Sequence, residues 1–279
     1  MAGASMKDIK LRIRSVESTM QITKAMQLVA SSKLRQARAR MEASRDYLDV
    51  AGRMVNAIAA HNSDNRSIFA VSREVKRRCY VVVAGDRGLA GSYNANIFKR
   101  IEAEKGDIPY CVVTVGRKAK EYFARRNVDI IASVEKAEGL RVADCAPVAG
   151  ALMKGFEKGD FDEVVLVYTT FVTVLSQTPA SRVLLPIIPE EKDEKPRQMI
   201  CEPGEAALIK RFMPQYLSGM IYAAVCDSFA SEQAARRVAM DSATKNAGQM
   251  IEDLSLRYNR ARQSSITQEL TEIVAGAEH

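Results

Sequence analysis

The first fifty or so residues contain nothing that would interrupt a helix. No proline precedes Pro109, and no glycine lies between Gly3 and Gly52, so the residues that most often break helices are missing from this stretch. Starting at Ile9, alternating steps of four and three residues lead to Ile58, and twelve of the fifteen positions on this path are apolar or alanine. A seven-residue repeat sustained over this length predicts a coiled coil rather than an ordinary surface helix.

The C-terminal part of the chain has the same kind of pattern, and no proline follows Pro214. Its apolar seam consists of Met240, Ala243, Ala247, Met250, Leu254, Tyr258 and Ala261, and after a skip of five it continues through Ile266, Leu270, Ile273 and Ala277. At about 1.5 Å per residue the two helices would be roughly 80 and 100 Å long, too long for the core of one domain. We therefore expect them to pack on each other in antiparallel fashion, and we expect a partner to cover the projecting end of the longer helix.

The middle of the chain alternates strand-like apolar runs with helical stretches. The expected strands are 79–85, 110–116, 128–134, 163–171 and 182–188, and the expected helices lie near 93–105, 117–126 and 141–158. This alternation predicts a central α/β (Rossmann-like) domain with a largely parallel sheet, followed by an exposed charged loop at 189–198. The predicted fold class is α/β. Terminal helices at 1–60 and 207–279 are expected to form a long antiparallel coiled coil, and residues 61–206 are expected to form the central domain.

The net charge of +7 is unevenly distributed along the chain. Residues 1–60 contain 11 lysines and arginines against 5 acidic residues, residues 61–206 contain 22 against 21, and residues 207–279 contain 8 of each. A basic N-terminal helix suits a nucleic acid, a membrane surface or an acidic protein, although it is also typical of a solvated helix face.

The five cysteines are scattered without a CxxC motif, and the chain has only two histidines. This pattern argues against a disulfide framework and a structural zinc site and favours reduced, buried cysteines. The apolar runs are shorter than the roughly 18 residues of a spanning helix, and the N-terminus lacks the apolar stretch of a signal peptide. We expect a soluble, cytosolic chain that could dock on a membrane protein.

The glycine-containing segment "AGDRGLAGS" follows the first expected strand and invites comparison with nucleotide-binding loops. No lysine follows its glycines as in a P-loop, and Gly85, Gly88 and Gly91 are spaced by three rather than as GxGxxG. Such a turn can form an anion-binding nest, but a tight structural turn, with Asp86 and Arg87 as a local ion pair, is the better interpretation. Motifs such as HExxH and GxSxG are absent. Composition and spacing thus predict a non-catalytic interaction protein without a metal or cofactor.

Three segments closely resemble the gamma subunit of bacterial F-type ATP synthases. They are "ITKAMQLVASSKLRQARAR" (22–40), "DRGLAGSYN" (86–94) and the stretch from Ser231 to Ala277, which ends in "ITQELTEIVAGA". The order of elements between them also agrees, so the resemblance covers essentially the whole chain. The chain departs from the family pattern at Ala90 and Ser92, where members often have cysteine and glycine, and at His279, where the pattern prefers a small or basic residue.

The resemblance implies a non-catalytic rotor shaft, present in a single copy, that couples ion flow to ATP synthesis or hydrolysis. The implied partners are the alpha and beta subunits of the alpha3beta3 ring, the epsilon subunit and the membrane c ring. The implied location is the cytoplasmic side of the cell membrane, as a peripheral protein without direct membrane insertion.

The resemblance also implies roles for particular residues. Contacts to a beta subunit are expected from Arg262, Gln263, Lys24, Lys33, Arg35 and Arg38. A bearing tip is expected from Ile266, Leu270, Ile273 and Ala277. A foot next to the c ring and epsilon is expected from Arg87, Tyr93 and Glu202. The alternatives are a basic coiled-coil protein that binds nucleic acid or acts as a scaffold, and an α/β enzyme with helical arms. DNA binding would be salt-sensitive, whereas the enzyme would bind nucleotide as an isolated chain.

Overall fold

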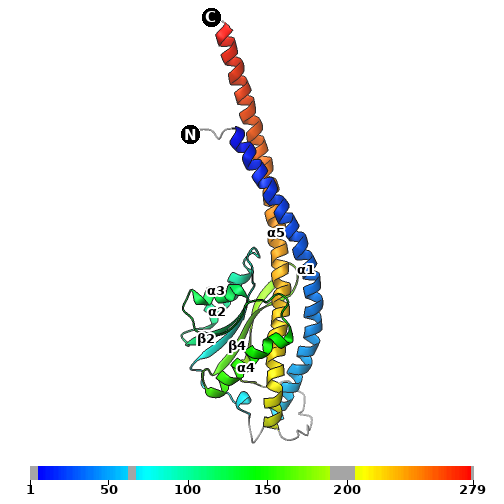
Figure 1. Ribbon diagram of the computed structural model, residues 1–279, viewed down its shortest axis with the longest axis vertical. Coiled ribbons are helices and arrows are strands. Elements are labelled where there is room, and N and C mark those ends of the chain that lie inside the picture. Colours follow the sequence, from blue (N-terminus) through cyan, green and yellow to red (C-terminus); the bar gives the residue numbers. More distant parts are fainter. Residues whose placement is uncertain (1–5, 62–66, 189–204, 278–279) are drawn as a thin grey trace. The chain divides into compact units, whose positions relative to one another are not determined.

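The computed structural model describes residues 6–61, 67–188 and 205–277, shown in Figure 1. Its elements are α1 (Met6–His61), η1 (Ile68–Ala70), β1 (Arg78–Val83), α2 (Tyr93–Glu104), β2 (Tyr110–Val115), α3 (Arg117–Ala124), β3 (Ile130–Val134), α4 (Val142–Lys158), β4 (Glu163–Phe171), β5 (Gln177–Leu185) and α5 (Glu205–Ala277). The predicted α/β class with long terminal helices is confirmed. The expected loop at 189–198 lies outside the described residues.

The chain forms two compact units whose boundaries cut across both long helices. One unit contains Met1–Ser31 and Arg236–His279, and the other contains Ser32–Ala235. The division into 1–60, 61–206 and 207–279 therefore remains a prediction about segments of the chain.

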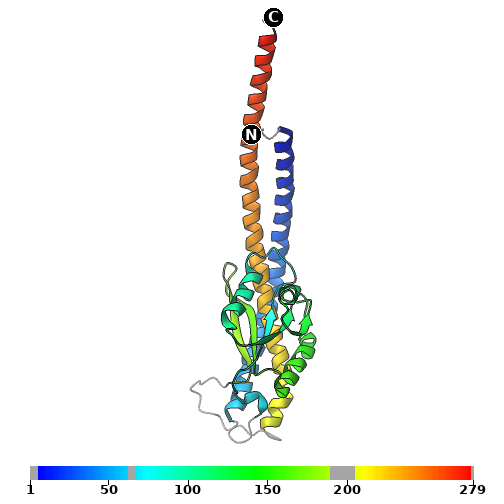
Figure 2. The same ribbon diagram turned by 90° about the vertical axis from the view of Figure 1, so that its left-hand side faces the viewer.

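In the first unit, α1 and α5 run antiparallel, and Figures 1 and 2 show them side by side. Thr23 lies opposite Thr244, with their hydroxyl oxygens 2.8 Å apart, and the Gln27 amide donates to Asp241 at 3.0 Å. A hydrogen bond from Lys245 lowers the pKa of Asp241. Ile9, Ala30, Met240, Ala247 and Leu254 are buried along the same seam. The predicted seven-residue pattern therefore marks the face on which the helices pack.

In the second unit, the sheet has the order β3-β2-β1-β4-β5. The first four strands are parallel, and β5 pairs antiparallel with β4. Alternate side chains point to opposite faces, so Tyr80 and Val82 pack against α2 and α3, whereas Cys79, Val81 and Val83 face α4 and α5. Burial on both faces explains why these strands read as continuous apolar runs.

One strand differs from the sequence prediction. The expected strand at 182–188 is observed as β5, Gln177–Leu185, and therefore begins five residues earlier. Its polar first half pairs with β4 through a register that starts at Phe171 and Gln177. Backbone pairing at a sheet edge does not require apolar side chains, which is why the sequence pattern hid this half.

Four cysteines are described, and all four are free and buried: Cys79, Cys111, Cys145 and Cys226. Burial raises the pKa of the Cys145 thiol to about 12. Cys201 lies outside the described residues. No helix among those in the described ranges is long and apolar enough to cross a membrane.

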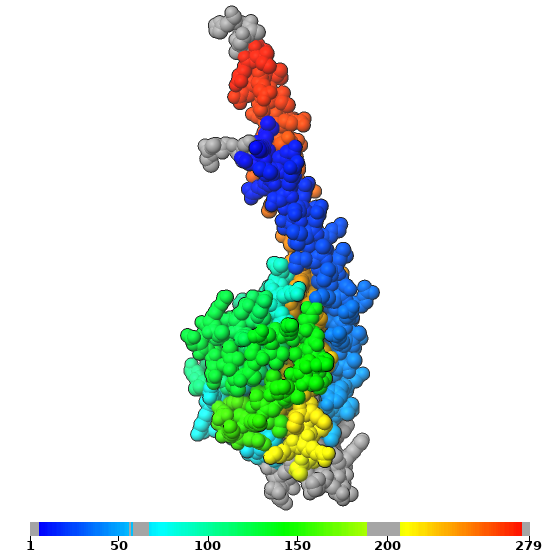
Figure 3. Space-filling model, in the orientation of Figure 1, coloured from blue at the N-terminus to red at the C-terminus, as the bar shows by residue number. Residues whose placement is uncertain are grey.

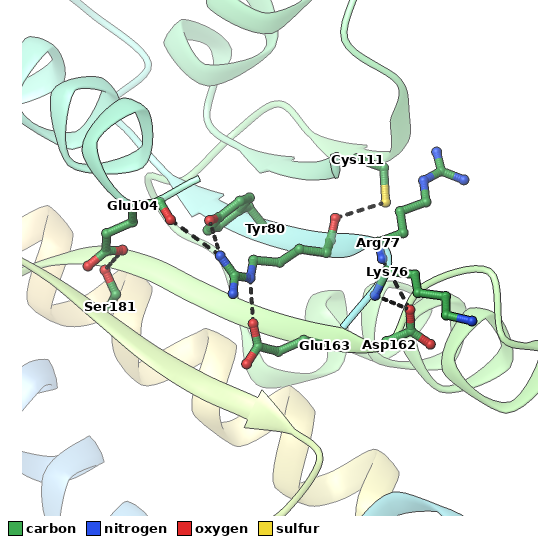
Figure 4. Close-up of polar contacts among 9 residues, drawn as sticks. Lys76, Arg77, Tyr80, Glu104, Cys111, Asp162, Glu163 and Ser181 are labelled. Carbon is green, nitrogen blue, oxygen red and sulfur yellow. Dashed lines mark hydrogen bonds and ion pairs between the residues drawn. The ribbon is translucent and has the colours of Figure 1, made fainter. Parts of the chain in front are cut away.

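The amino edge of the parallel sheet is held by polar contacts around Arg78, shown in Figure 4. Its guanidinium contacts Glu163 on β4 and donates to the Tyr80 hydroxyl at 3.0 Å and to the Glu104 carbonyl at 3.3 Å. One carboxylate oxygen of Asp162 accepts from the backbone N–H groups of Lys76 and Arg77. These contacts join β1, β4 and α2 at the amino edge of the sheet.

Candidate partner interface

The turn after β1 lies at the carboxyl edge of the sheet and is held by its polar side chains. The Asn94 side chain accepts from the Gly85 N–H at 2.9 Å. The Asp86 carboxylate accepts from the backbone N–H groups of Arg117, Ala137 and Glu138 at 3.1, 3.0 and 3.3 Å. Asp86 therefore ties the carboxyl ends of β1, β2 and β3 together, a role that the expected local pair with Arg87 did not include.

A side chain of α5 packs on the turn after β1, beside the place where many α/β sheets bind ligands. The strand order reverses between β1 and β4, and such reversal points are where open α/β sheets bind ligands. Glu232 of α5, only 5% exposed, packs on Gly85 so closely that a Cβ at Gly85 would lie 2.8 Å from its Cδ. This close approach gives Gly85 a packing role and supports the structural interpretation of the turn.

We expect Gly85→Ala to lower the free energy of unfolding by about 2 kcal/mol, because a methyl group would force the buried Glu232 side chain to move. Gly88→Ala is the matched control, since no heavy atom lies within 4 Å of a Cβ there, and it should change stability by less than about 0.5 kcal/mol. Urea unfolding followed by tyrosine circular dichroism measures both. Equal midpoints for the two variants would contradict the packing role.

The C-terminal end of α5 exposes large aliphatic side chains. Ile266, Leu270, Ile273 and Val274 are 46, 57, 67 and 61% exposed, and Figure 3 shows this end of α5, in red, without a neighbouring helix on the visible face. The helix extends to Ala277, whose side chain lies outside the description. Runs of exposed apolar residues mark surfaces that another molecule covers.

Further exposed aliphatic residues lie outside the predicted seams. On α1 they include Leu11, Ile22, Leu28 and Val29, each more than half exposed, and on α5 they include Leu256. Sequence reasoning missed them because the seven-residue count followed only the packing face. The sequence signal that could have identified them is the presence of large aliphatic residues outside the packing face of each helix.

Comparison with known proteins gives one consistent result. The family model described as ATP synthase matches residues 5–279. The ATP synthase gamma chain of Ruminococcus albus is 45% identical over 97% of this chain and 96% of its own length. The sodium-ion-specific gamma chain of Acetobacterium woodii is 40% identical over 98% of both chains. This chain belongs to the ATP synthase gamma-chain family.

Chains of solved ATP synthase structures share the fold. A chain from the Euglena gracilis mitochondrial ATP synthase rotor in rotational state 1 aligns with a TM-score of 0.70 at 19% identity, covering 94% of this chain and 98% of that one. A second Euglena structure, of OSCP, F1 and c ring in rotational state 3, gives 0.73 at 19% identity, with coverages of 98 and 93%. The expected gamma subunit is confirmed, and nothing favours the nucleic-acid or scaffold alternative.

The basic residues expected to contact beta subunits differ in their surroundings. Lys24, Arg35 and Arg38 are exposed on α1, and Arg262 and Gln263 are exposed on α5. Lys33 instead forms an ion pair with Glu138 at 2.5 Å. An intramolecular partner already occupies the Lys33 ammonium group, so its role in a gamma-chain interface would require that pair to rearrange.

The turn at Arg87 and the start of α5, both expected near the foot, do not lie together. The Asp86 carboxylate contacts Glu138, which pairs with Lys33, and Lys33 precedes the end of α1 at His61 by 28 residues, or about 40 Å. The start of α5 lies at that far end of α1, because a Cβ at Gly219 would contact Tyr47. The turn at Arg87 and the start of α5 therefore belong to opposite ends of this unit.

The structure describes two of the three residues expected at the foot. Tyr93, the first residue of α2, is 5% exposed and lies in the buried cluster between α2 and the sheet, so its side chain offers almost no surface to a partner. Arg87 is exposed on the turn. Glu202 lies outside the described residues.

Proposed function

We propose that this gamma chain is the non-catalytic rotor of an F1Fo ATP synthase, coupling ion flow through a membrane ring to ATP synthesis or hydrolysis in an alpha3beta3 ring. The observation that carries the proposal is the exposed aliphatic surface of α5 from Ile266 to Val274, on a chain of this family. An apolar surface without directed ion pairs can slide inside a collar while it still excludes water. One rod inside a pseudo-threefold ring contacts three identical subunits differently, so each is biased toward a different conformation and nucleotide affinity.

The residue roles follow from this arrangement. Ile266, Leu270, Ile273 and Ala277 would form the bearing, and Arg262 and Gln263 below them would contact a beta subunit and pass torque. Lys24, Arg35 and Arg38 would meet acidic beta surfaces, and Lys33 would join them only by leaving Glu138. Arg87 would contact a neighbouring subunit from the sheet edge rather than from the foot.

The remaining partners are the epsilon subunit and the c ring. The similar Tetrahymena thermophila chain belongs to a structure of the central stalk and c ring, with a TM-score of 0.61 at 22% identity over 80% of this chain and 99% of that one. The chain would be present in one copy and would be peripheral on the cytoplasmic side of the cell membrane.

Co-expression with the alpha and beta subunits tests the proposal. We expect an affinity tag on this chain to recover both subunits in a complex that hydrolyses ATP, because the ring provides the nucleotide sites. The isolated chain is the control, and calorimetry should detect no tight binding of ATP or DNA to it. Failure to recover the ring, or tight binding of either ligand by the isolated chain, would overturn the rotor assignment.

A further inference from the structure

The loop between β4 and β5 is a short hairpin with unusual residues at its tip. Residues 172–176 read VTVLS, whereas tight turns are usually built from glycine, proline, asparagine, aspartate and serine. The hairpin is nevertheless well bonded. The N–H groups of Val172 and Thr173 donate to the Ser176 carbonyl at 3.3 and 3.0 Å, and the Ser176 N–H donates back to the Thr173 carbonyl at 3.3 Å.

The side chain of Gln177 closes the hairpin from its base. Its amide nitrogen donates to the carbonyls of Thr173 and Val174 at 3.1 and 2.7 Å. Val174 packs against the buried cluster that contains Leu34, Met41 and Phe171. Hydrogen bonds from the Gln177 side chain and the packing of Val174 therefore fix the backbone of the tip.

This fixed backbone presents two aliphatic side chains to solvent. Leu175 is 83% exposed, more than any other large hydrophobic residue in the described ranges, and Val172 is 57% exposed. A backbone that is already fixed before binding lowers the conformational entropy lost when a partner covers its side chains, which favours strong contributions to binding.

The surroundings of the hairpin are basic. The Arg38 guanidinium lies 5.5 Å from the centroid of the Phe171 ring, and Arg45 donates to the Phe171 carbonyl at 3.3 Å. The carboxylate of Asp227 is already paired with Arg45 at 2.9 Å and its side chain is only 14% exposed. Arg45 and Asp227 neutralise each other, so the positive charge that an approaching surface would meet beside the apolar tip comes from Arg38.

We propose that Leu175 and Val172 dock into an apolar depression with an acidic rim on a beta subunit of the ring. Arg38 would face the acidic rim, and the hairpin would be a contact separate from the α5 tip. The inference rests on the proposed function, since it requires the ring to surround this chain. Apolar packing at the centre and charge attraction at the rim is the usual anatomy of a specific protein interface.

Site-specific photo-crosslinking in the assembled complex tests this contact. A benzoylphenylalanine at position 175 should give an adduct that mass spectrometry identifies as this chain joined to beta. The matched control is the same group at Val142, an exposed aliphatic residue at the start of α4, which should give at least tenfold less adduct with beta. Absence of a beta adduct at position 175, or an adduct there with another subunit only, would overturn the inference.

A charge variant provides a second measurement. Leu175→Asp should reduce ATP hydrolysis by the assembled complex about threefold or more, because a carboxylate would replace the apolar contact and repel the acidic rim. Val142→Asp, which places the same charge on an exposed aliphatic position outside the hairpin, should retain the activity. If alpha and beta are recovered but Leu175→Asp is as active as Val142→Asp, only the hairpin contact fails. If no ring subunit is recovered even with the unmodified chain, the proposed function fails.

Discussion

Gly116→Ala is expected to destabilise the α/β part of the chain by about 4 kcal/mol. Gly116 has φ +95° at the start of α3, and an added Cβ would lie 2.0 Å from the Ala84 carbonyl oxygen and 2.9 Å from its carbon. The obstacle is backbone, so no side-chain rotation can relieve it. The Gly116 N–H also donates to the Val134 carbonyl at 2.7 Å, and displacement of Gly116 would weaken that bond as well.

The measurement is thermal unfolding followed by near-ultraviolet circular dichroism of the tyrosines, since the chain has no tryptophan. A loss of about 4 kcal/mol corresponds to a midpoint lower by roughly 10 °C. Gly106→Ala is the control, because Gly106 also has positive φ, at +55°, but no heavy atom lies within 4 Å of its Cβ position. It should cost only about 1 kcal/mol. If the two variants unfolded at the same temperature, the close approach of Ala84 to Gly116 would not exist in solution.

Arg262→Ala combined with Gln263→Ala is expected to lower ATP hydrolysis by the assembled complex about tenfold, equivalent to about 1.4 kcal/mol in the barrier. Both side chains are exposed on α5, so their removal should change the stability of the helix pair by less than about 0.5 kcal/mol. The effect should therefore arise at the partner. The yield of co-purified alpha and beta should be unchanged, because the apolar tip is retained.

The control removes the same two residue types elsewhere on the same helix. The control variant is Arg257→Ala with Gln268→Ala. Each of these residues lies five positions along α5 from the tested residue of the same type, and therefore about 140° away around the helix axis. This variant should retain most of the activity. Equal losses in the two variants would show that the face carrying Arg262 and Gln263 has no special role in turnover, and loss of the complex itself would assign them to assembly instead.

Much of the fold was predictable because its signals are local. The seven-residue spacing from Ile9 identified the packing face of α1. The apolar runs located β1, β2 and β4, whose side chains are buried on both faces of the sheet. The first half of β5 was missed, because its pairing with β4 depends on backbone bonds rather than on its own side chains.

The candidate site was less predictable, because exposure and pairing depend on residues far apart in the chain. Lys33 was expected to contact a partner, but it forms an ion pair with Glu138, which lies more than a hundred residues further along the chain. Tyr93 was expected to contact a partner at the foot, but its side chain is buried between α2 and the sheet. Leu175 had no pattern around it, since an isolated leucine in a turn gives no periodicity to read.

The sequence by itself determined that two long helices pair, that an α/β unit lies between them, and that the chain belongs with ATP synthase gamma chains. Periodicity and motif are properties of neighbouring residues, and they remain visible without coordinates. Only the tertiary structure decided that Glu232 packs on Gly85, that Asp86 accepts from three backbone N–H groups, and that the Arg87 turn lies far from the start of α5. Those facts depend on which distant segments the folding chain brings together, because burial, close approach and charge pairing are set by neighbours in space.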